Sequence, residues 1–259
     1  MRMRAILGVV TGALALSALA VPAAQADDVV GDTKISNVVV NGGKAVVAGA
    51  TGQKTFTVSF TATDDSGIDW AQAILFHGSD IESSDTGAVA NSSDLRATCT
   101  AVNATTSTCK SSFTVAAGDN LFNGAAGGWK VWALAAATDA DYVQKDNVKG
   151  FKVQRASKLT VNASPEPVKK GKTITVTGSL TRANWDTGRY AGYTAQSVKL
   201  QFKKKGTTTY GDVKTVTSGS AGALRTTVTA SVDGYYRYNF AGTTTTPAVK
   251  AAGDFIDVQ

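Results

Sequence analysis

Residues 151–180 read FKVQRASKLTVNASPEPVKKGKTITVTGSL. One alternating strand pattern ends here, a second begins at Leu159, and Pro165 and Pro167 interrupt it. Proline cannot donate a hydrogen bond to a sheet ladder, and glycine adopts turn conformations at little steric cost, so Pro-x-Pro followed by Lys-Lys-Gly predicts a turn. The fresh alternating run from Ile174 predicts that new β-structure opens after that turn. We therefore expect the chain to change domain within this stretch.

The sequences on the two sides of this stretch share a pattern. Residues 54–59 (KTFTVS) match residues 172–177 (KTITVT), and residues 128–135 (GWKVWALA) parallel residues 234–241 (GYYRYNFA). The interval between the two motifs is 74 positions in the first copy and 62 in the second, so the first copy holds 12 extra residues. The sequence therefore predicts two versions of one structural unit.

Short alternating segments account for most of both halves. We identify six such segments in the first half and seven in the second, and no stretch after residue 26 shows the period of 3.6 that indicates a helix. Seven short strands in about 100 residues, rich in Thr and Val, are typical of an immunoglobulin-like sandwich. We predict an all-β fold of two tandem immunoglobulin-like (Greek-key) β-sandwich domains, residues 27–155 and 156–259.

Residues 1–26 have the pattern of a cleaved secretory signal peptide. Arg2 and Arg4 precede the uncharged apolar run 5–21, and residues 24–26 read AQA, the small-x-small pattern of a cleavage site. A membrane anchor is the alternative, but the run is shorter than the roughly 20 residues that a spanning helix needs. We expect a secreted protein, extracellular or cell-wall associated, with no transmembrane segment in the mature chain.

Cys99 and Cys109 are the only cysteines. They lie ten positions apart with turn-forming Asn, Thr and Ser residues between them, which in an exported chain predicts a disulfide that closes a hairpin. A metal site or redox pair is disfavoured, because the spacing is not Cys-x-x-Cys and a single histidine cannot complete a usual zinc set. The hairpin falls inside the longer interval of the first copy, so we interpret it as the insertion.

Charge is divided unevenly between the two halves. Residues 27–155 carry 10 basic and 14 acidic side chains, net −4, whereas residues 156–259 carry 14 basic and 6 acidic side chains, net +8. Anions such as wall polymers could be held by the second half and cations by the first. Alternatively, the two domains attract each other, or the charges only keep the protein soluble.

The junction sequence and the run DGYYR at residues 233–237 resemble those of secreted immunoglobulin-like proteins common in actinobacteria. These proteins are largely uncharacterised and are often called calcium-binding proteins. The resemblance covers both domains, and its motifs are structural. It implies the fold and the export of the chain, and it implies calcium binding as a property to test.

Acidic residues gather in two loops of the first domain. In an immunoglobulin-like topology the loop after the second strand (residues 63–69) and the loop after the sixth (from residue 138) lie at one end, beside the N-terminus, where Asp27, Asp28 and Asp32 should also arrive. Ca²⁺ takes about six to eight oxygen ligands. The candidate ligands are Asp64, Asp65, Asp69, Asp139 and Asp141.

The alternative for these aspartates is a purely local role. Asp-Ser-Gly and Asp-Ala-Asp are ordinary turn sequences whose side chains bond their own backbone. An EF-hand is excluded, because counting from Asp139 the sixth position is Gln144 and the twelfth is Gly150, where that loop requires glycine and glutamate.

The corresponding loop of the second domain, residues 183–193, carries aromatic residues and an arginine. Trp185, Arg189, Tyr190 and Tyr193 could stack on and bond to sugar rings. However, this loop should face the first domain, so we favour the interpretation that it packs the interdomain junction.

No motif specifies an activity, so we expect a non-catalytic binding or structural protein of the cell envelope or the medium, with Ca²⁺ as the one candidate cofactor. The partners would be an envelope polysaccharide or another extracellular protein; nucleic acid is not expected, since no recognition helix or RNA-binding motif occurs. The first alternative is an accessory protein that binds carbohydrate or a cell-wall polymer. The second is a carboxylate-based hydrolase, because a carboxylate pair can be recognised only in three dimensions. His77, the sole histidine, we interpret as a strand-end residue rather than a base.

Overall fold

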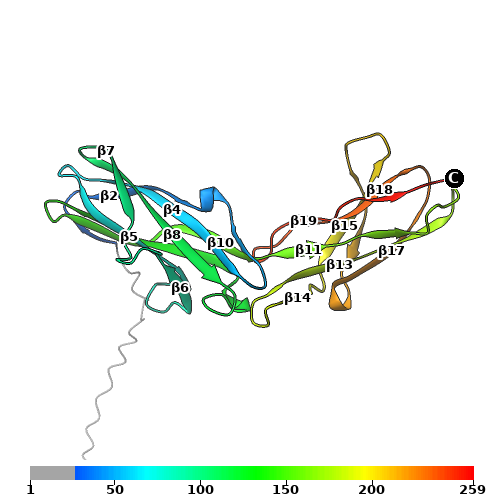
Figure 1. The fold of residues 1–259 in the computed structure, drawn as a ribbon, viewed down its shortest axis with the longest axis horizontal. Coiled ribbons are helices and arrows are strands. Elements are labelled where there is room, and N and C mark those ends of the chain that lie inside the picture. The colour runs from blue at the N-terminus through cyan, green and yellow to red at the C-terminus, as the bar shows by residue number, and fades with distance from the viewer. Residues whose placement is uncertain (1–26) are drawn as a thin grey trace, which may run out of the picture.

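The computed structural model describes residues 27–259, so the signal peptide predicted for residues 1–26 lies outside the described residues. Strands dominate this part of the chain, and they form two sandwiches arranged end to end (Figure 1). The only helical elements among these residues are three short 3-10 turns, η1 (Asn41–Gly43), η2 (Asn123–Ala125) and η3 (Ser220–Gly222). None of the described residues belongs to a helix long and apolar enough to cross a membrane.

The first sandwich consists of a six-stranded and a four-stranded sheet. The six-stranded sheet has the order β1-β10-β9-β5-β6, with β3 paired to β10. The four-stranded sheet has the order β2-β4-β8-β7. The bounds are β1 Asp28–Val30, β2 Lys34–Val40, β3 Val46–Ala48, β4 Gln53–Thr63, β5 Ile68–His77, β6 Thr86–Val89, β7 Thr98–Asn103, β8 Thr106–Ala116, β9 Gly127–Ala137 and β10 Tyr142–Arg155.

This arrangement is the immunoglobulin-like topology predicted above. Strands β2, β4, β8 and β7 take the places of strands A, B, E and D, and β5, β9 and β10 take those of C, F and G. Burial alternates along each strand with the period of 2 that a half-buried strand requires, most regularly in β9. The inward residues of both sheets meet in one core that includes Phe56, Phe60, Phe113 and Trp129.

The second sandwich also has two sheets, each of five strands. In one sheet β13 (Thr173–Asn184) pairs with four partners: β11 (Ser157–Leu159), β12 (Asn162–Ser164), β14 (Arg189–Gly192) and β17 (Ala223–Thr229). The other has the order β16-β15-β18-β19, with β20 also paired to β18; its bounds are β15 Ser197–Lys204, β16 Gly211–Thr217, β18 Gly234–Phe240, β19 Val249–Lys250 and β20 Asp254–Ile256. Ile174, Leu200, Leu224 and Tyr238 are buried in its separate core.

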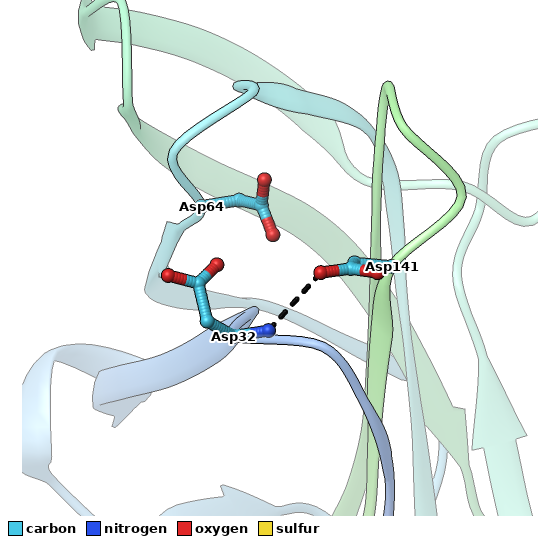
Figure 2. A group of neighbouring side chains, drawn as sticks. All are labelled: Asp32, Asp64 and Asp141. Atoms are coloured by element: carbon cyan, nitrogen blue, oxygen red, sulfur yellow. Dashed lines mark hydrogen bonds between the residues drawn. The ribbon is translucent and has the colours of Figure 1, made fainter.

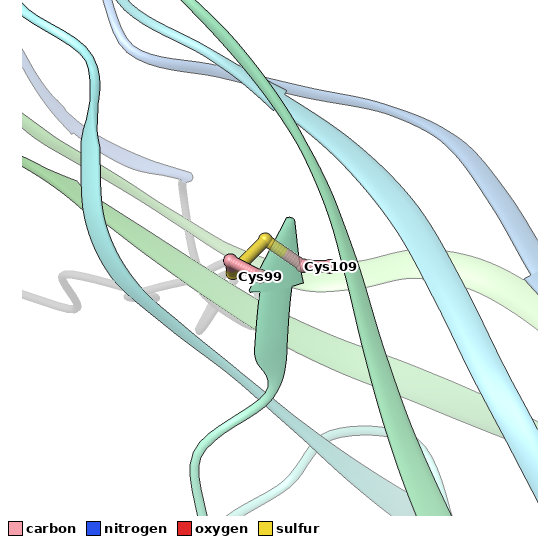
Figure 3. The surroundings of a disulfide bond; sticks show 2 residues. All are labelled: Cys99 and Cys109. Atoms are coloured by element: carbon pink, nitrogen blue, oxygen red, sulfur yellow. A yellow bond between two sulfur atoms is a disulfide. The ribbon is translucent and has the colours of Figure 1, made fainter. Parts of the chain in front are cut away.

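The predicted disulfide between Cys99 and Cys109 is confirmed. The two cysteines lie directly opposite each other in the register of β7 and β8, with an S–S distance of 2.03 Å (Figure 3). The hairpin adds strand β7 to the edge of its sheet. In the second sandwich β17 pairs with β13 as β8 pairs with β4, and no further strand pairs with β17 among the described residues. The disulfide hairpin is therefore where the first sandwich is longer.

The two sandwiches are joined by a short, bonded connection. Ala156 alone separates β10 from β11, and its N–H donates to the carbonyl oxygen of Ala48 over 2.9 Å. The buried Arg155 side chain donates through Nε to the carbonyl oxygen of Ala183 over 2.6 Å. Gln154 donates to the carbonyl oxygens of Thr243 and Thr244, at 3.0 and 3.2 Å. Backbone groups of both sandwiches are thus tied to this linker.

Residues 183–193 form a hairpin, so the prediction of a loop there was wrong. The tip of the β13–β14 hairpin reaches the first sandwich, and Trp185 at this tip is 1% exposed and belongs to the first sandwich's core. Asn123 of η2 fixes the tip, since its Oδ1 accepts from the Trp185 N–H over 3.0 Å and its N–H donates to Asp186 Oδ1 over 2.9 Å. Trp185, one of the aromatic residues that mark this segment in the sequence, is therefore a buried contact between the two sandwiches.

Candidate metal centre

Three turns meet at the end of the first sandwich that faces away from the second. They are the β1–β2 turn (residues 31–33), the β4–β5 loop (residues 64–67) and the β9–β10 loop (residues 138–141). Figure 2 shows three aspartates that converge from these turns, Asp32, Asp64 and Asp141. One carboxylate oxygen from each lies within 4.8 Å of those of the other two.

Asp64 is the buried centre of this cluster. Its side chain is 3% exposed, and both carboxylate oxygens accept hydrogen bonds: Oδ2 from Thr33 Oγ1 at 2.6 Å, and Oδ1 from the Ser66 N–H at 2.9 Å and Ser66 Oγ at 2.6 Å. Burial alone would raise the pKa of Asp64, but these hydrogen bonds outweigh it and hold the pKa below its ordinary value. Asp64 is therefore an ionised carboxylate in a fixed orientation.

The β1–β2 turn closes against the carboxylate of Asp141. Asp141 Oδ2 accepts a hydrogen bond from the Asp32 N–H over 3.1 Å. Gly31, at φ +73°, lies so close that a Cβ placed on it would meet the same oxygen at 1.5 Å. Only glycine fits both this left-handed backbone and this contact, so the turn is shaped around the carboxylate.

Asp64, Asp65 and Asp139 form a second group, also with carboxylate oxygens within 4.8 Å of one another. The two loops that carry them are bonded together: Thr138 Oγ1 donates to the carbonyl oxygen of Ser66 over 2.6 Å. The negative charge of Asp32, with smaller contributions from neighbouring aspartates, raises the pKa of Asp65 above its ordinary value. The two groups share Asp64 and thus bring five carboxylates to one end of the sandwich.

No basic side chain forms a direct ion pair with this acidic end within residues 27–259, although Lys34 lines the same pocket as Asp32, Asp64 and Asp65. Two further acidic residues nearby are paired elsewhere, because Asp27 lies 3.2 Å from Lys145 Nζ and Asp28 accepts a hydrogen bond from the Tyr142 hydroxyl over 2.7 Å. Carboxylate oxygens are the ligand type that Ca²⁺ prefers, so the donor set fits a hard divalent cation.

Four of the five predicted ligands come together, and one does not. Asp64, Asp65, Asp139 and Asp141 belong to the two groups, whereas Asp69 belongs to neither and lies on strand β5, exposed, beside a groove lined by Trp70 and Tyr142. Asp32 was expected at this end but was not among the predicted ligands. The Gly-Asp turn in front of the first long strand is the signal that could have identified it.

The aromatic residues proposed as an alternative sugar site do not form one surface. Trp185 is buried and cannot offer its ring face to a sugar. The Tyr190 ring is covered by Lys158 Nζ at 3.9 Å, and the Tyr193 ring by the Arg182 guanidinium at 3.9 Å. Arg189 is exposed at the start of β14. Trp185 and Tyr190 pack against the first sandwich, whereas Tyr193 packs against the core of the second, so the four residues form no common binding platform.

His77 ends strand β5, as predicted. Its Nδ1 lies 2.7 Å from Asp85 Oδ1, and the imidazole lies 6.1 Å from the Trp129 ring, centroid to centroid. No serine, threonine or cysteine side chain hydrogen-bonds His77 within residues 27–259. The described chain therefore shows no nucleophile activated by its single histidine.

The fold and the disulfide hairpin define an all-β protein of the immunoglobulin-like class. Within that class, a family model described as a family of unknown function (DUF5707) matches residues 40–135. The match runs from the last residue of β2 through β3 and β4 to most of β9, includes both cysteines, and stops before Asp139 and Asp141. The chain is thus similar to this family over part of its first sandwich. No curated protein matches the chain.

Solved immunoglobulin-like structures resemble the chain at low identity. The D00-D0 domain of intimin is 15% identical with a TM-score of 0.29, covering 86% of this chain and 99% of that one. Titin domains Z1Z2 in complex with telethonin are 10% identical with a TM-score of 0.24, covering 88% and 96%. A protein described as membrane anchored, from Corynebacterium diphtheriae, is 11% identical with a TM-score of 0.32, covering 86% and 53%. Likenesses at these scores carry no argument about function.

Proposed function

We propose that this chain is an exported, non-catalytic binding or structural protein whose acidic end, defined as Asp32, Asp64, Asp65, Asp139 and Asp141, binds Ca²⁺. Two observations support export: the signal-like sequence of residues 1–26 and the disulfide, a bond that persists in oxidising compartments. The partner would be an envelope polysaccharide or another extracellular protein, held by a scaffold that the cation stiffens.

The observation that carries the cation site is the convergence of Asp32, Asp64 and Asp141 from three separate turns. Like charges at these separations repel each other unless a cation lies between them. The charge of Asp32 also raises the pKa of the neighbouring Asp65, so negative charge accumulates around these turns. A bound Ca²⁺ would remove the repulsion and link the three turns, with Asp64 as the fixed inner ligand and Asp32 and Asp141 closing from the sides.

The opposing interpretation is that the aspartates are turn residues and nothing more. It accounts for Asp64, which bonds to Ser66, and for Asp139, whose Oδ1 accepts the Asp141 N–H over 3.2 Å. It does not account for the side chain of Asp32, which accepts no hydrogen bond from residues 27–259 and nevertheless points at two other carboxylates. The two interpretations differ in what happens when Ca²⁺ is added.

Thermal unfolding of the mature protein in EDTA, in millimolar Ca²⁺ and in Mg²⁺ tests the proposal. A ligand that binds only the folded state, present at about ten times its Kd, adds about 1.4 kcal/mol of stability, which for a domain of this size raises Tm by on the order of 5 °C. Ca²⁺ should produce such a rise, and Mg²⁺ should produce less, because it demands a stricter octahedral geometry.

Two variants of equal charge change make the test specific. Asp141→Asn keeps the shape that Gly31 packs against but removes one carboxylate, so it should abolish most of the calcium-induced rise. Asp69→Asn removes a carboxylate at the same end that belongs to neither group, so it should leave the rise intact. No rise in the wild-type protein, or an equal loss in both variants, would contradict the cation site.

A further inference from the structure

The outer face of the β15–β18 sheet carries cations and aromatic rings in register. Lys203 lies opposite Tyr235, which lies opposite Phe255 on β20. Two residues along each strand, on the same face, Gln201 lies opposite Arg237. Because side chains alternate along a strand, Lys203, Gln201, Tyr235 and Arg237 all point away from the core that holds Leu200 and Tyr238. We call Lys203, Tyr210, Tyr235, Arg237 and Phe255 the basic face.

The Arg237 guanidinium contacts Tyr210 and Gln201, and its two Nη atoms are left without a partner among residues 27–259. The guanidinium carbon lies 3.7 Å from the centroid of the Tyr210 ring, and Nε donates to Gln201 Oε1 over 2.9 Å. Gln201 is fixed in turn, because its Nε2 donates to Asp212 Oδ1 over 2.7 Å. Within residues 27–259 neither Nη atom makes a hydrogen bond or an ion pair. A guanidinium held in this way presents a planar set of donors at little further entropic cost.

Lys203 brings a second positive charge to the same ring. Its Nζ lies 5.2 Å from the centroid of Tyr210 and 4.6 Å from that of Tyr235. The Tyr210 hydroxyl lies against Gly253, 2.1 Å from the position that a Cβ on this glycine would take. Two cations are therefore gathered around one positioned tyrosine without a carboxylate between them.

The acidic residues close to this face are already engaged. Asp212 pairs with Lys199 and bonds to Gln201, and Asp233 lies 3.1 Å from Lys205 Nζ while accepting the Val258 N–H. Arg237 and Lys203 have no ion-pair partner within the described chain. An external anion would supply the missing charge, and the guanidinium geometry suits a carboxylate, sulfate or phosphate group.

We infer that the basic face binds an acidic polysaccharide, with Arg237 and Lys203 bonding its anionic groups and with the edges of the Tyr235 and Phe255 rings, whose faces lie beneath lysines, in contact with its sugars. Tyr235 and Phe255 lie side by side with centroids 5.1 Å apart and are half-buried, so they offer apolar edges next to the cations. This combination of aromatic surface and polar donors suits a sugar chain.

The geometry favours a sugar chain over single-stranded nucleic acid. Bases stack on open, roughly parallel ring faces, whereas Tyr235 and Phe255 are tilted by 52° and the Tyr210 face is covered by Arg237. The disulfide also indicates an oxidising compartment. The inference does not depend on the cation site at the other end of the molecule.

Binding of the mature protein to immobilised dextran sulfate and to uncharged dextran tests the inference. The experiment is done in EDTA, so that failure of the cation site cannot affect it. We expect binding to dextran sulfate only, weakening as salt rises. Arg237→Gln and Lys203→Gln should each weaken binding by about tenfold, the effect of losing one charged hydrogen bond.

Arg225→Gln is the matched control. Arg225 lies exposed on β17 in the opposite sheet of the same sandwich, so its loss removes the same charge from another face. Binding should change less than about twofold. Equal weakening by Arg225→Gln would show attraction by net charge alone and would overturn the inference, as would absence of binding to dextran sulfate.

Two competing occupants are also outcomes of the test. Tighter binding to a single-stranded oligonucleotide than to dextran sulfate, lost in Arg237→Gln, would overturn the polysaccharide assignment in favour of nucleic acid. Self-association at low salt that Arg237→Gln abolishes, measured by sedimentation, would assign the face to the acidic end of a second copy instead.

Discussion

The same end of the sandwich has opposite roles in the two halves of the molecule. In the first sandwich the connections that follow β4 and β9 carry Asp64, Asp65, Asp139 and Asp141 and face away from the rest of the chain. In the second, the connections that follow the equivalent strands β13 and β18 carry Trp185 and residues 243–246, and they pack against the first sandwich and the linker. The first end gathers carboxylates, whereas the second buries Trp185 and Thr246 at the contact between the sandwiches.

The difference shows how two copies of one fold can use the same loops differently, for contact between domains in one copy and for a candidate binding site in the other. The pairings of β4 with β8 and of β5 with β9 have counterparts in β13 with β17 and β15 with β18, so this shared framework does not distinguish the two copies. The connections are where the copies differ, because loop residues are not constrained by a sheet ladder. Each of the following predictions concerns a residue or bond of one sandwich and states the expected change in stability.

The largest effect is expected from Trp185→Ala. Trp185 belongs to the second sandwich by sequence but fills the core of the first, so its loss should reduce the free energy of unfolding by about 3–5 kcal/mol. Urea unfolding followed by circular dichroism measures this. Trp132→Ala is the control, since Trp132 is half-buried on the outer face of β9 and should cost less. Equal costs would mean that Trp185 is not a core residue.

Reduction of the disulfide should affect the first sandwich alone. Removing a bridge that closes a loop of this length costs about 2–4 kcal/mol. Trp70, Trp129 and Trp132 lie in the first sandwich and Trp185 in its core, so tryptophan fluorescence reports unfolding of this half. Dithiothreitol or the double variant Cys99→Ala/Cys109→Ala should lower the midpoint of that transition. A fluorescence midpoint that stays unchanged would show that the hairpin does not depend on the bond.

Alkaline pH should weaken the second sandwich. Burial raises the pKa of Tyr238 to about 12, and its hydroxyl donates to the carbonyl oxygen of Val176 over 2.9 Å. Because the folded pKa exceeds that of the unfolded chain, the stabilisation is fully present below about pH 10 and is lost as pH rises towards 12, by about 2–3 kcal/mol. Urea unfolding across this range measures the loss, which Tyr238→Phe should largely remove. A loss of the same size in Tyr238→Phe would assign it elsewhere.

Acid should weaken the first sandwich through Asp64. Hydrogen bonds from Ser66 and Thr33 lower the pKa of Asp64, so its stabilisation is present above its unfolded pKa and is lost as pH falls through the folded pKa. Asp64→Asn should cost about 1.5 kcal/mol near neutral pH, in calcium-free buffer, and flatten the acid side of the stability profile. An acid profile that is the same in the variant and the wild-type protein would contradict this assignment.

The sequence was sufficient to predict the features that depend on local pattern. The all-β fold and the disulfide follow from period-2 alternation and from cysteine spacing, and both are confirmed. Asp64, Asp65, Asp139 and Asp141 were placed together because a Greek-key topology fixes which loops share an end.

Features that depend on tertiary packing could not be predicted in the same way. Asp69 was grouped with the loop, but β5 begins at Ile68, and strand geometry then separates its side chain from the cluster. Residues 183–193 were expected to pack at the interdomain junction, as Trp185 does, but the sequence could not show that Trp185 fills the core of the neighbouring sandwich. Similarly, the position of Arg237 between Tyr210 and Gln201 depends on how the β15–β16 hairpin folds back.

Calorimetric titration of the mature protein with Ca²⁺ tests the central claim most directly. We expect saturable binding with a Kd on the order of 10⁻⁴ to 10⁻³ M, as in other extracellular calcium modules, weakened at least about tenfold by Asp141→Asn and unchanged by Asp69→Asn. Absence of saturable heat over that concentration range, or identical binding by Asp141→Asn, would show that the acidic end is only a set of turns.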